Sequence, residues 1–424
     1  MKDEPTGRRT LRELEAEVEA EMREWGRRRL AEKLQQQADQ HGRVFLPQSG
    51  RAVQQRRRQT LHLRTVGGEV ELQVWYGYDP GTRRWGSPIR QHWGLSAHQQ
   101  LSAGLEDKLA YLATATGTYA LAAAVASKCA GVSVDASTVH ALVQRLGQKA
   151  EAQTQARLEH WPAEAQPQRA ASALAVVMLD GWLVRQRGPG WGKKRTRQPR
   201  VAWHELKTGV FYRQEQTVRG RAEKRGQLTE KVVVSWQGEP LELGRRLHWE
   251  AQRGGLGRAR AVLAVADGAP WIWNVVQDRW AQAVQVLDFY HASQHLWALG
   301  LAWHQEDEVR ARPWVEARLH QLRQGRGADV LAELAGLRPR RGRLGQIVRR
   351  EQNYFAAHAA RMNYRAMARR GWPIGSGAVE SACRQRQCRY KRSGQSWTAR
   401  GLRHLCALEE ARDNNHWEQL WTAA

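Results

Sequence analysis

Apolar residues recur at two different periods along the chain, and the change of period divides it into parts. From Thr10 onward they return every third or fourth position, which is the spacing of one face of an α-helix. Glu13 follows Thr10 at the distance of a capping box. The pattern predicts a long amphipathic helix that either packs on its own domain or pairs with a second copy, through Leu11, Leu14, Val18, Met22 and Trp25.

A period of two residues follows. The segments 61–66 and 70–75 alternate apolar and polar residues, and the Gly67-Gly68 pair between them favours a tight turn. The sequence therefore predicts a β-hairpin here, directly after the basic run Arg56-Arg57-Arg58.

A helix-turn-helix is the preferred interpretation of the next part. Helices are predicted over 119–130 and 137–146, and the segment 131–134 between them has the length of a tight turn. The second helix would enter the major groove of DNA with Ser137, Thr138 and His140. An ordinary helical hairpin is the alternative. Segment 159–171, which contains Pro162 and Pro167, is typical of a linker.

Buried strands alternate with helices in the rest of the chain. Three strands, one helix and then a strand–helix–strand unit are expected, which is the order of a ribonuclease-H-like core. The strands cover 173–180 (with 181–187 continuing or turning), 201–212, 231–236, 261–266 and 284–287, and the helices 241–253 and 271–280. An Arg-rich helical insertion is expected over about 292–370.

The expected fold is thus an α/β catalytic core, a ribonuclease-H-like mixed sheet with helices, interrupted by a helical insertion. A mainly helical N-terminal DNA-binding region precedes it. The expected divisions are 1–60 (helix and basic segment), 61–158 (hairpin and helix-turn-helix), 159–171 (linker) and 172–424 (catalytic domain).

Charge narrows the class of partner. The chain has 67 Lys and Arg against 42 Asp and Glu, a net charge of +25, and such a field attracts nucleic acid. Four cysteines without a C-x-x-C pair exclude a disulfide framework and a Cys-ligated zinc finger, and they fit a reducing cytosol. The charged start shows no secretory signal, and the longest apolar stretch, 109–130, is too weakly hydrophobic for a membrane span. A cytoplasmic, nucleoid-associated protein is expected.

Three separated acidic residues carry the candidate chemistry. Asp180 and Asp267 each end an apolar run and precede a glycine, and Glu380 stands where a glycine-rich turn enters a predicted helix. Such carboxylates are the ligands that two Mg²⁺ (or Mn²⁺) ions need for in-line displacement at a phosphodiester. Asp288 and His291, at another strand-to-helix junction, are candidate supporting residues.

Other motifs give little support to other chemistries. His291 and His295 lack the third ligand of a zinc site. Segment 188–193 resembles a phosphate loop, but its spacing is one residue short and Ser or Thr is missing, so no nucleotide cofactor is expected. Ser376 lacks the G-x-S-x-G elbow of serine hydrolases.

Basic residues around these motifs are the candidate DNA contacts. They follow Glu380 closely and also fill the glycine-rich segment before residue 200, and Trp397 is the candidate for stacking on a base. The set is Lys193, Lys194, Arg384, Arg389, Lys391 and Arg392, in addition to Arg56, Arg57 and Arg58.

These motifs together resemble a known family. L-D-G-W at Asp180, A-D-G-A-x-W-I-W at Asp267, L-D-F-Y-H-A-S-x-H-L-W at Asp288 and P-I-G-S-G-A-V-E-S-A-C at Glu380 are similar to bacterial insertion-sequence DDE transposases of the Kra type, which are related to Mutator-like transposases. The resemblance covers about residues 173–415. It implies a ribonuclease-H-like domain with Asp180, Asp267 and Glu380 as the metal-binding triad, and supporting roles for Asp288 and His291.

The resemblance also implies a reaction and partners. Such an enzyme hydrolyses the phosphodiester at the ends of its element and then joins the exposed 3′-OH to target DNA, as a dimer or a larger assembly that holds both ends. Many members carry a Cys-rich zinc ribbon where this chain has Tyr76–Pro80 without cysteine, so recognition would depend on the helix-turn-helix and the basic patches. The alternatives are a catalytically silent DNA-binding relic or repressor and, third, a ribonuclease H or resolvase.

Overall fold

The computed structural model describes residues 9–46, 49–96, 98–160, 172–218, 226–338 and 342–422. These residues form two compact units that divide between Leu146 and Gly147, and each is treated separately below. The division falls within one long helix, whereas we expected it at 159–171. Residues 161–171 lie outside the described residues, so the linker stays a prediction.

In the first unit, one long helix packs on a hairpin. The helix α1 (Leu11–His41) opens with the predicted capping box, in which Thr10 and Glu13 bond each other's backbone amides. Strands β1 (Gln54–Thr65) and β2 (Gly68–Asp79) pair antiparallel with Thr65 opposite Gly68, which confirms the predicted hairpin. The short β3 (Arg84–Gly86) completes this sheet.

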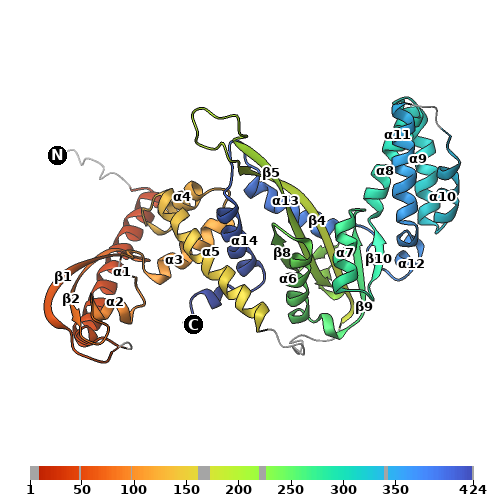
Figure 1. Cartoon of the computed structure of the whole chain (residues 1–424). Helices are drawn as coiled ribbons and strands as arrows, with labels where there is room; N and C mark the ends of the chain where they lie inside the picture. The colour runs from red at the N-terminus through yellow and green to blue at the C-terminus, as the bar shows by residue number, and fades with distance from the viewer. Residues whose placement is uncertain are drawn as a thin grey trace, which may run out of the picture. The chain divides into compact units, whose positions relative to one another are not determined.

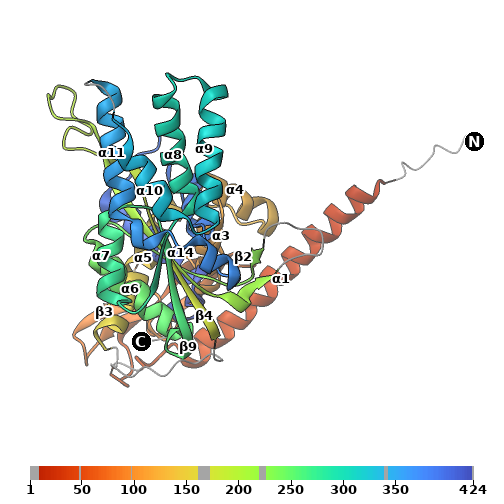
Figure 2. The ribbon, with the colours of Figure 1, turned by 90° about the vertical axis from the view of Figure 1, so that its right-hand side faces the viewer.

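The apolar stripe of α1 has two different environments. Its C-terminal half packs through Ala31, Leu34 and Ala38 on the buried face of the β1–β2 hairpin. Its N-terminal half, which extends outwards in Figure 2, carries the five residues of the predicted stripe, and all of them are exposed, Leu11 by 73% and Trp25 by 71%. The packing on the hairpin therefore comes from residues beyond the predicted stripe.

Among the described residues, four further helices belong wholly or partly to the first unit. They are α2 (Pro88–His92), α3 (Ala103–Ala115), α4 (Tyr119–Ala130) and α5 (Ala136–Glu159), the last of which continues into the second unit. The two helices expected at 119–130 and 137–146 are confirmed as elements, and Gly131 ends α4 in the left-handed conformation at φ 64°. The pair has the connectivity of a helix-turn-helix; its contact with DNA stays a prediction.

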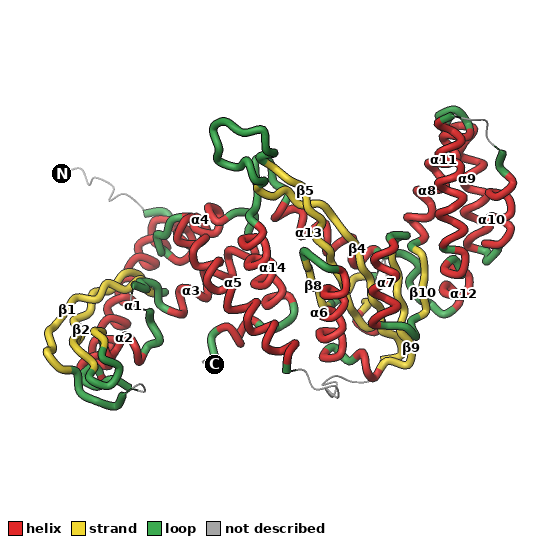
Figure 3. Tube along the Cα trace, viewed as in Figure 1, coloured by secondary structure: helices red, strands yellow, loops and turns green. Residues whose placement is uncertain are grey.

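A mixed five-stranded sheet forms the centre of the second unit (Figure 3). Its strands are β4 (Ser172–Arg187), β5 (Val201–Arg213), β8 (Val232–Trp236), β9 (Ala259–Ala266) and β10 (Val284–Leu287), in the order β10-β9-β4-β5-β8. β5 runs antiparallel to both neighbours, and β4, β9 and β10 run parallel. Every predicted strand is confirmed, and residues 181–187 continue β4 instead of turning.

Helices cover both faces of this sheet. On one face, α6 (Pro240–Arg253) and α7 (Pro270–Arg279) bury the alternate residues Ala175, Val177 and Leu179 of β4. The opposite face is in contact with α13 (Gly377–Tyr390), where Trp182 of β4 lies against Tyr390. The remaining elements near the sheet are α14 (Ala399–Asp413), the two-stranded β6 (Thr217–Val218) and β7 (Gln227–Leu228), and the short helices η1 (Gln214–Gln216), η2 (Leu256–Arg258) and η4 (Trp417–Leu420).

The predicted insertion is a separate helical bundle beyond β10 (Figure 1). It consists of α8 (Phe289–Trp303), α9 (Glu308–Arg323), α10 (Gly327–Gly336), α11 (Arg343–Ala357), η3 (Ala359–Arg361) and α12 (Tyr364–Arg369). Among the helices in the described parts of the chain, none is long and apolar enough to cross a bilayer.

Candidate metal centre

Three aspartates lie at the same level of three neighbouring parallel strands, Asp180 within β4 and the other two directly after β9 and β10. Leu179 of β4 pairs with Ala266 of β9, and Ala266 pairs in turn with Leu287 of β10. The next residue of each strand is an aspartate: Asp180, Asp267 and Asp288. Adjacent strands lie about 4.8 Å apart, so the register itself sets three carboxylates in one row.

Side chains alternate between the two faces of a sheet, and this decides the face to which the aspartates point. Leu179 and Ala266 belong to the core under α6 and α7, so the residues that follow them turn towards the opposite face, which α13 covers. Glu380 lies in the first turn of α13. The fold therefore brings the fourth carboxylate to the Asp288 end of the row, from a segment 380 − 288 = 92 residues away in sequence.

Asp288 is fully buried and holds the start of the insertion to its end. Its Oδ1 accepts hydrogen bonds from the backbone N–H groups of Tyr290 and, at 3.0 Å, His291, which makes Asp288 the N-cap of α8. Its Oδ2 accepts from both the backbone N–H and the hydroxyl of Ser376, the residue before α13. All of these bonds engage the carboxylate with protein donors, so Asp288 acts mainly as a positioning residue.

Glu380 lies within ligand distance of this clamp. Ligand atoms of Asp288, His291 and Glu380 all lie within 4.8 Å of one another, and the Ser376 hydroxyl is 2.9 Å from Glu380 Oε1. A hydroxyl has one proton, so Ser376 donates to Asp288 or to Glu380 but not to both at once. A cation beside Glu380 would relieve this competition, because Glu380 would then need no donor from Ser376.

The environment of Asp180 disfavours its negatively charged form. Burial, which favours the neutral form, raises the pKa of Asp180, and the charge of nearby Asp267 raises it further. Hydrogen bonds from the Cys383 thiol and the Gly181 N–H, together with the charge of His291, lower the pKa but do not cancel the effect of burial. A divalent cation bound here would stabilise the ionised form of Asp180.

The residue types fit a hard divalent cation. Asp180, Asp267 and Glu380 are half-buried and keep access to solvent, whereas Asp288 is enclosed. Carboxylate oxygens with room for water and for a phosphate oxygen suit Mg²⁺ or Mn²⁺. His291 is half-buried in the same cluster and would serve as a further ligand or as a proton carrier.

The helical insertion supports the row from the other side. Helix α11 places Tyr354 against Gly268, the residue after Asp267, and His358 just beyond α11 forms a hydrogen bond with the Gly268 backbone. Tyr354 also stacks on His295 of α8 with ring centroids 3.6 Å apart, and His295 Nδ1 lies 2.6 Å from Glu351, which is fully buried. Burial first, and then the charges of Asp267 and Asp288, raise the pKa of the Tyr354 phenol.

The basic residues after Glu380 divide into two groups. Arg384 is exposed one turn beyond Glu380, and Lys391 and Arg392 are exposed where α13 ends, so all three are accessible to a phosphate backbone. Two predictions in this segment are wrong. Arg389 is 6% exposed with its guanidinium 5.5 Å from the Trp397 ring centre, and Trp397 itself is 7% exposed.

Trp397 is a structural anchor. Its indole N–H donates to the Tyr390 carbonyl at 3.0 Å, and its backbone bridges to β4 through Arg185 and Arg187. A base cannot stack on a ring that is packed inside the protein. The expectation of stacking came from the polar neighbours of Trp397 in sequence, which the fold places around a buried indole.

The other candidate DNA contacts are exposed. In the first unit, the exposed N-terminal half of β1 carries Arg56, Arg57 and Arg58. The guanidinium carbons of Arg56 and Arg58 lie 5.2 and 4.3 Å from the centre of the Trp75 ring. Arg58 also pairs with Asp39 at 2.8 Å, which reduces its charge available to DNA.

At the start of α5, Ser137 and His140 are exposed and Thr138 is half-buried. The Asp135 carboxylate accepts from the backbone N–H and the hydroxyl of Thr138, and also from the Ser137 hydroxyl. In the second unit, Lys193 and Lys194 are exposed in the loop between β4 and β5. The structure therefore leaves these residues accessible; their binding to DNA stays a prediction.

Residues that sequence reasoning missed complete the centre. Ser376 and Cys383 lie in the recognised Glu380 motif, and their proximity to Glu380 was a usable signal. Tyr354 and His358 belong to the insertion, and no local pattern connects them with Asp267. The register that aligns Asp288 with the other two aspartates was also not readable from the sequence.

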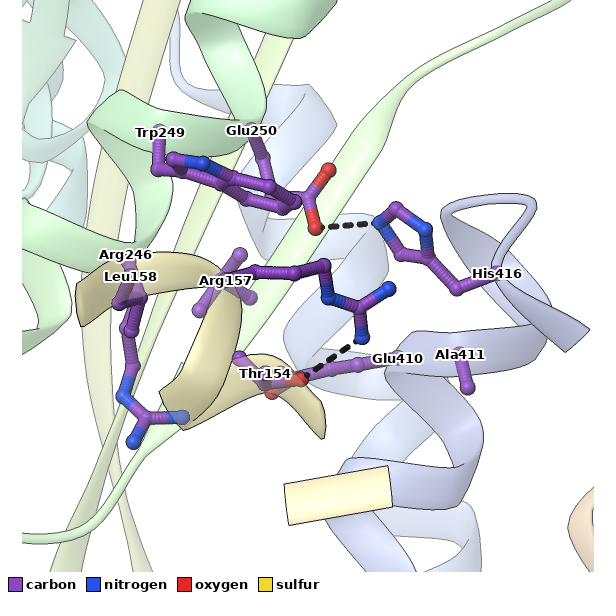
Figure 4. Close-up of a pocket in the computed structure, with 10 residues that line it drawn as sticks. Thr154, Arg157, Leu158, Arg246, Trp249, Glu250, Glu410, Ala411 and His416 are labelled. Carbon is purple, nitrogen blue, oxygen red and sulfur yellow. Dashed lines mark hydrogen bonds and ion pairs between the residues drawn. The ribbon is translucent and has the colours of Figure 1, made fainter. Parts of the chain in front are cut away.

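A second polar cluster in this unit has a different character (Figure 4). Arg157, Arg246, Glu250, Glu410 and His416 surround a space of about 10 Å³, which has room for about one water molecule. His416 Nε2 bonds Glu250 at 2.7 Å, and Arg246 pairs with Glu151 at 2.9 Å. The space leaves no room for a substrate, so this cluster is structural.

Comparison with known proteins assigns nearly the whole chain to one family. The model of the uncharacterised protein family UPF0236 matches residues 7–419. The chain belongs to this family. No curated protein matches it. Because UPF0236 is defined without a function, membership leaves the resemblance to Kra-type transposases as a hypothesis, and the carboxylate row is the strongest indication of chemistry in this UPF0236 chain.

Replacement of Gly268 by Ala should disturb the row. A Cβ at Gly268 would lie 2.3 Å from Tyr354 Cε2 and 2.8 Å from His358 Nε2, so either α11 or the Asp267 turn must move. Overpacking of this kind costs about 1–3 kcal/mol, and we expect Mn²⁺ affinity to fall about tenfold or more, measured by calorimetry. Gly336→Ala is the control, because its Cβ would meet nothing within 4 Å. Equal Mn²⁺ affinity of the two variants would contradict the assignment.

Glu410 should make stability depend on pH. Although the residue as a whole is half-buried, its carboxyl lies in the cluster, and burial raises the pKa of Glu410 to about 8. The folded state then binds a proton that the unfolded state has released, so this group makes the protein less stable as pH rises from about 4.5 to 8.

We expect Glu410→Gln to remove that loss, gaining a few kcal/mol at most relative to wild type between pH 5 and 9 in urea unfolding. The exposed Glu418→Gln is the matched control. Identical pH profiles for wild type and Glu410→Gln would show that Glu410 is ionised throughout.

Proposed function

We propose that this chain is a metal-dependent DNA transposase. The observation that carries the proposal is the row of Asp180, Asp267 and Asp288 at one level of the sheet, with Glu380 brought to the same place by α13. The chain around this acidic centre has a net charge of +25, so a polyanionic substrate would be attracted to a site that is itself negative.

The topology supports a ribonuclease-H-like interpretation. In order of sequence the five strands are arranged 5-4-1-2-3, and the second runs antiparallel to the first. One acidic residue lies within the first strand, and the other two directly follow the fourth and fifth. The order of the elements along the chain agrees with the predicted one. The bundle α8–α12 enters after the fifth strand and returns to the sheet at Glu380, where the resemblance places an insertion.

Each residue would have a defined role. Asp180, Asp267 and Glu380 would hold two Mg²⁺ or Mn²⁺ ions, which when bound activate the attacking oxygen and stabilise the leaving one. Asp288 positions Glu380 through Ser376, and His291 lies close enough to accept or deliver a proton. Arg384, exposed one turn from Glu380, would hold a phosphate of the scissile strand.

The reaction would have two displacements at phosphorus. In the first, a water oxygen attacks the phosphodiester at the element end, the bond to the 3′-oxygen breaks, and that oxygen takes up a proton. In the second, the new 3′-OH attacks a phosphodiester of target DNA, loses its proton and displaces a 3′-oxygen there. Neither step needs a covalent bond to the protein, and a dimer or larger assembly would be required to hold two ends.

The second candidate is a DNA-binding protein without activity, a relic or repressor of its element. The exposed Arg56–Arg58 run and the α4–α5 helix pair would be enough for that function. The intact acidic row favours catalysis, because three clustered carboxylates destabilise a protein that does not use them.

The test is metal-dependent cleavage of DNA that carries the flanks of the element. We expect cleavage with Mg²⁺ by the wild-type protein, and a loss of more than about a hundredfold in Asp180→Asn, Asp267→Asn and Glu380→Gln, because each would remove a metal ligand. Asp278→Asn is the matched control, since Asp278 is exposed and pairs only with Arg279 among the ion pairs of the described residues.

The outcomes separate the candidates. Binding without cleavage by the wild-type protein would favour the repressor. Equal cleavage by wild type and Asp267→Asn would remove Asp267 from the centre and overturn the triad.

A further inference from the structure

The hairpin β4–β5 extends beyond the sheet to which it belongs. β9 pairs with β4 only as far as Leu179, and β8 pairs with β5 only over Lys207–Phe211. Beyond those points the two strands pair with each other as far as Arg187 and Val201, and the loop that joins them projects from the sheet in Figure 1. We call residues 181–206 the β-arm.

Positive charge dominates the β-arm. Its only acidic residue is Glu205, which pairs with Lys207 at 2.8 Å. Within the described parts of the chain, no carboxylate lies at ion-pair distance from the cations of the β-arm, so their charge is available to an external anion. These cations are Arg185, Arg187, Lys193, Lys194, Arg195, Arg197 and Arg200.

Aromatic and aliphatic side chains lie exposed among these cations. Trp203 is 58% exposed and stands directly opposite Arg185 in the ladder, and Leu183 on the same face is 52% exposed. Trp191 in the loop is 41% exposed and lies 5.1 Å below the Arg187 guanidinium. Large apolar groups exposed between unpaired cations are typical of a surface that contacts nucleic acid.

The strand end of the β-arm next to its loop is bonded to the segment that follows α13. Arg187 N–H donates to the Trp397 carbonyl at 2.8 Å, and Trp397 N–H donates to the Arg185 carbonyl at 3.1 Å. Through its indole, Trp397 is bonded to Tyr390 in the last turn of α13, the helix that carries Glu380. The β-arm is therefore bonded to the end of the helix that carries Glu380 at its start.

The distance between the β-arm and the carboxylates follows from strand geometry. Asp180 immediately precedes the β-arm, and the seven residues from Asp180 to Arg187 span about 23 Å at about 3.3 Å per residue. One strand of duplex DNA rises about 3.4 Å per base, so this span corresponds to about seven base pairs.

We propose that the β-arm binds a DNA duplex through its phosphates about seven base pairs from the phosphodiester at the carboxylate row. The binding is independent of sequence, because phosphate contacts position a protein without specifying bases. The position of this contact relative to a cut rests on the proposed function; the binding of duplex DNA by the β-arm does not.

The first experiment measures the salt dependence of binding to a random-sequence 30-base-pair duplex without divalent metal. Four β-arm cations are replaced by alanine: Lys193, Lys194, Arg195 and Arg197. Each phosphate contact contributes about 0.9 to the slope of log K against log salt, so the slope should become shallower by about 3.6. Between 50 and 200 mM salt, wild-type affinity should therefore fall about 100-fold more than that of the variant.

A matched control removes the same charge elsewhere. Arg9, Arg12, Arg28 and Arg29 are exposed in or beside α1, where glutamates surround them, and their replacement by alanine should change the slope by less than one. An equal change in both quadruple variants would show only a general charge effect, and an unchanged slope in the β-arm variant would overturn the proposal.

A second experiment locates the contact. A photo-crosslinking amino acid at Trp191 should react with duplex about seven base pairs from the position of Mg²⁺-dependent cleavage. A crosslink within two base pairs of the cut, or no crosslink to DNA, would contradict the assigned position. The two proposals can fail separately. If the wild-type protein does not cleave DNA, but the salt slopes of wild type and the β-arm variant differ as expected, the β-arm binds DNA and the proposed transposase activity is wrong.

Discussion

The carboxylate of Asp288 is the interaction on which the candidate centre depends. It caps α8 with one oxygen and holds Ser376 with the other, so a single side chain joins residues 88 positions apart. The backbone repeats this closure, because the Phe289 N–H donates to the Ile374 carbonyl at 2.9 Å. The insertion can therefore be large without displacing Glu380, since its two ends are fixed beside each other whatever the bundle between them does.

The sheet sets the second constraint, which is electrostatic. The register of β4, β9 and β10 forces Asp180 and Asp267 side by side, and burial adds to their mutual repulsion. Side chains compensate in part, through the Cys383 thiol and the charge of His291. Tyr354 and His358 enclose the Gly268 turn and prevent the Asp267 loop from moving away. A protein that holds carboxylates together against their repulsion is arranged for a cation.

The sequence predicted individual elements well because their signals are local. Each strand of the second unit is an apolar run of the right length, and the Thr10–Glu13 capping box and the Gly67-Gly68 turn are formed by neighbours in the chain. The three acidic positions were visible because each follows such a run or a glycine-rich turn. What joins Asp180 and Asp267 is the register between β4 and β9, and what brings Glu380 near is the packing of α13 on the sheet. Both depend on contacts between residues far apart in the chain.

The errors have the same origin. Trp397 and Arg389 were assigned to DNA because their neighbours in sequence are polar or basic, but Trp397 packs on Tyr390 and Arg389 lies over the Trp397 ring, and both are buried. The predicted stripe of α1 was expected to pack on its own domain or on a second copy, and within its unit all five of its residues are exposed. Local composition predicts exposure only when no distant segment covers it, and here the segment after α13 folds back onto β4.

Because the chain returns to β4 after α13, Trp397 supports the hairpin formed by β4 and β5. By pairing with Arg185 and Arg187, Trp397 adds a short third strand to a hairpin that would otherwise have two. Isolated two-stranded hairpins are only marginally stable in water. Strand β4 then carries a carboxylate in its middle and cations at its exposed end. A polyanion held by the cations of the β-arm would meet attraction there, and the repulsive carboxylates only where a cation can bridge them.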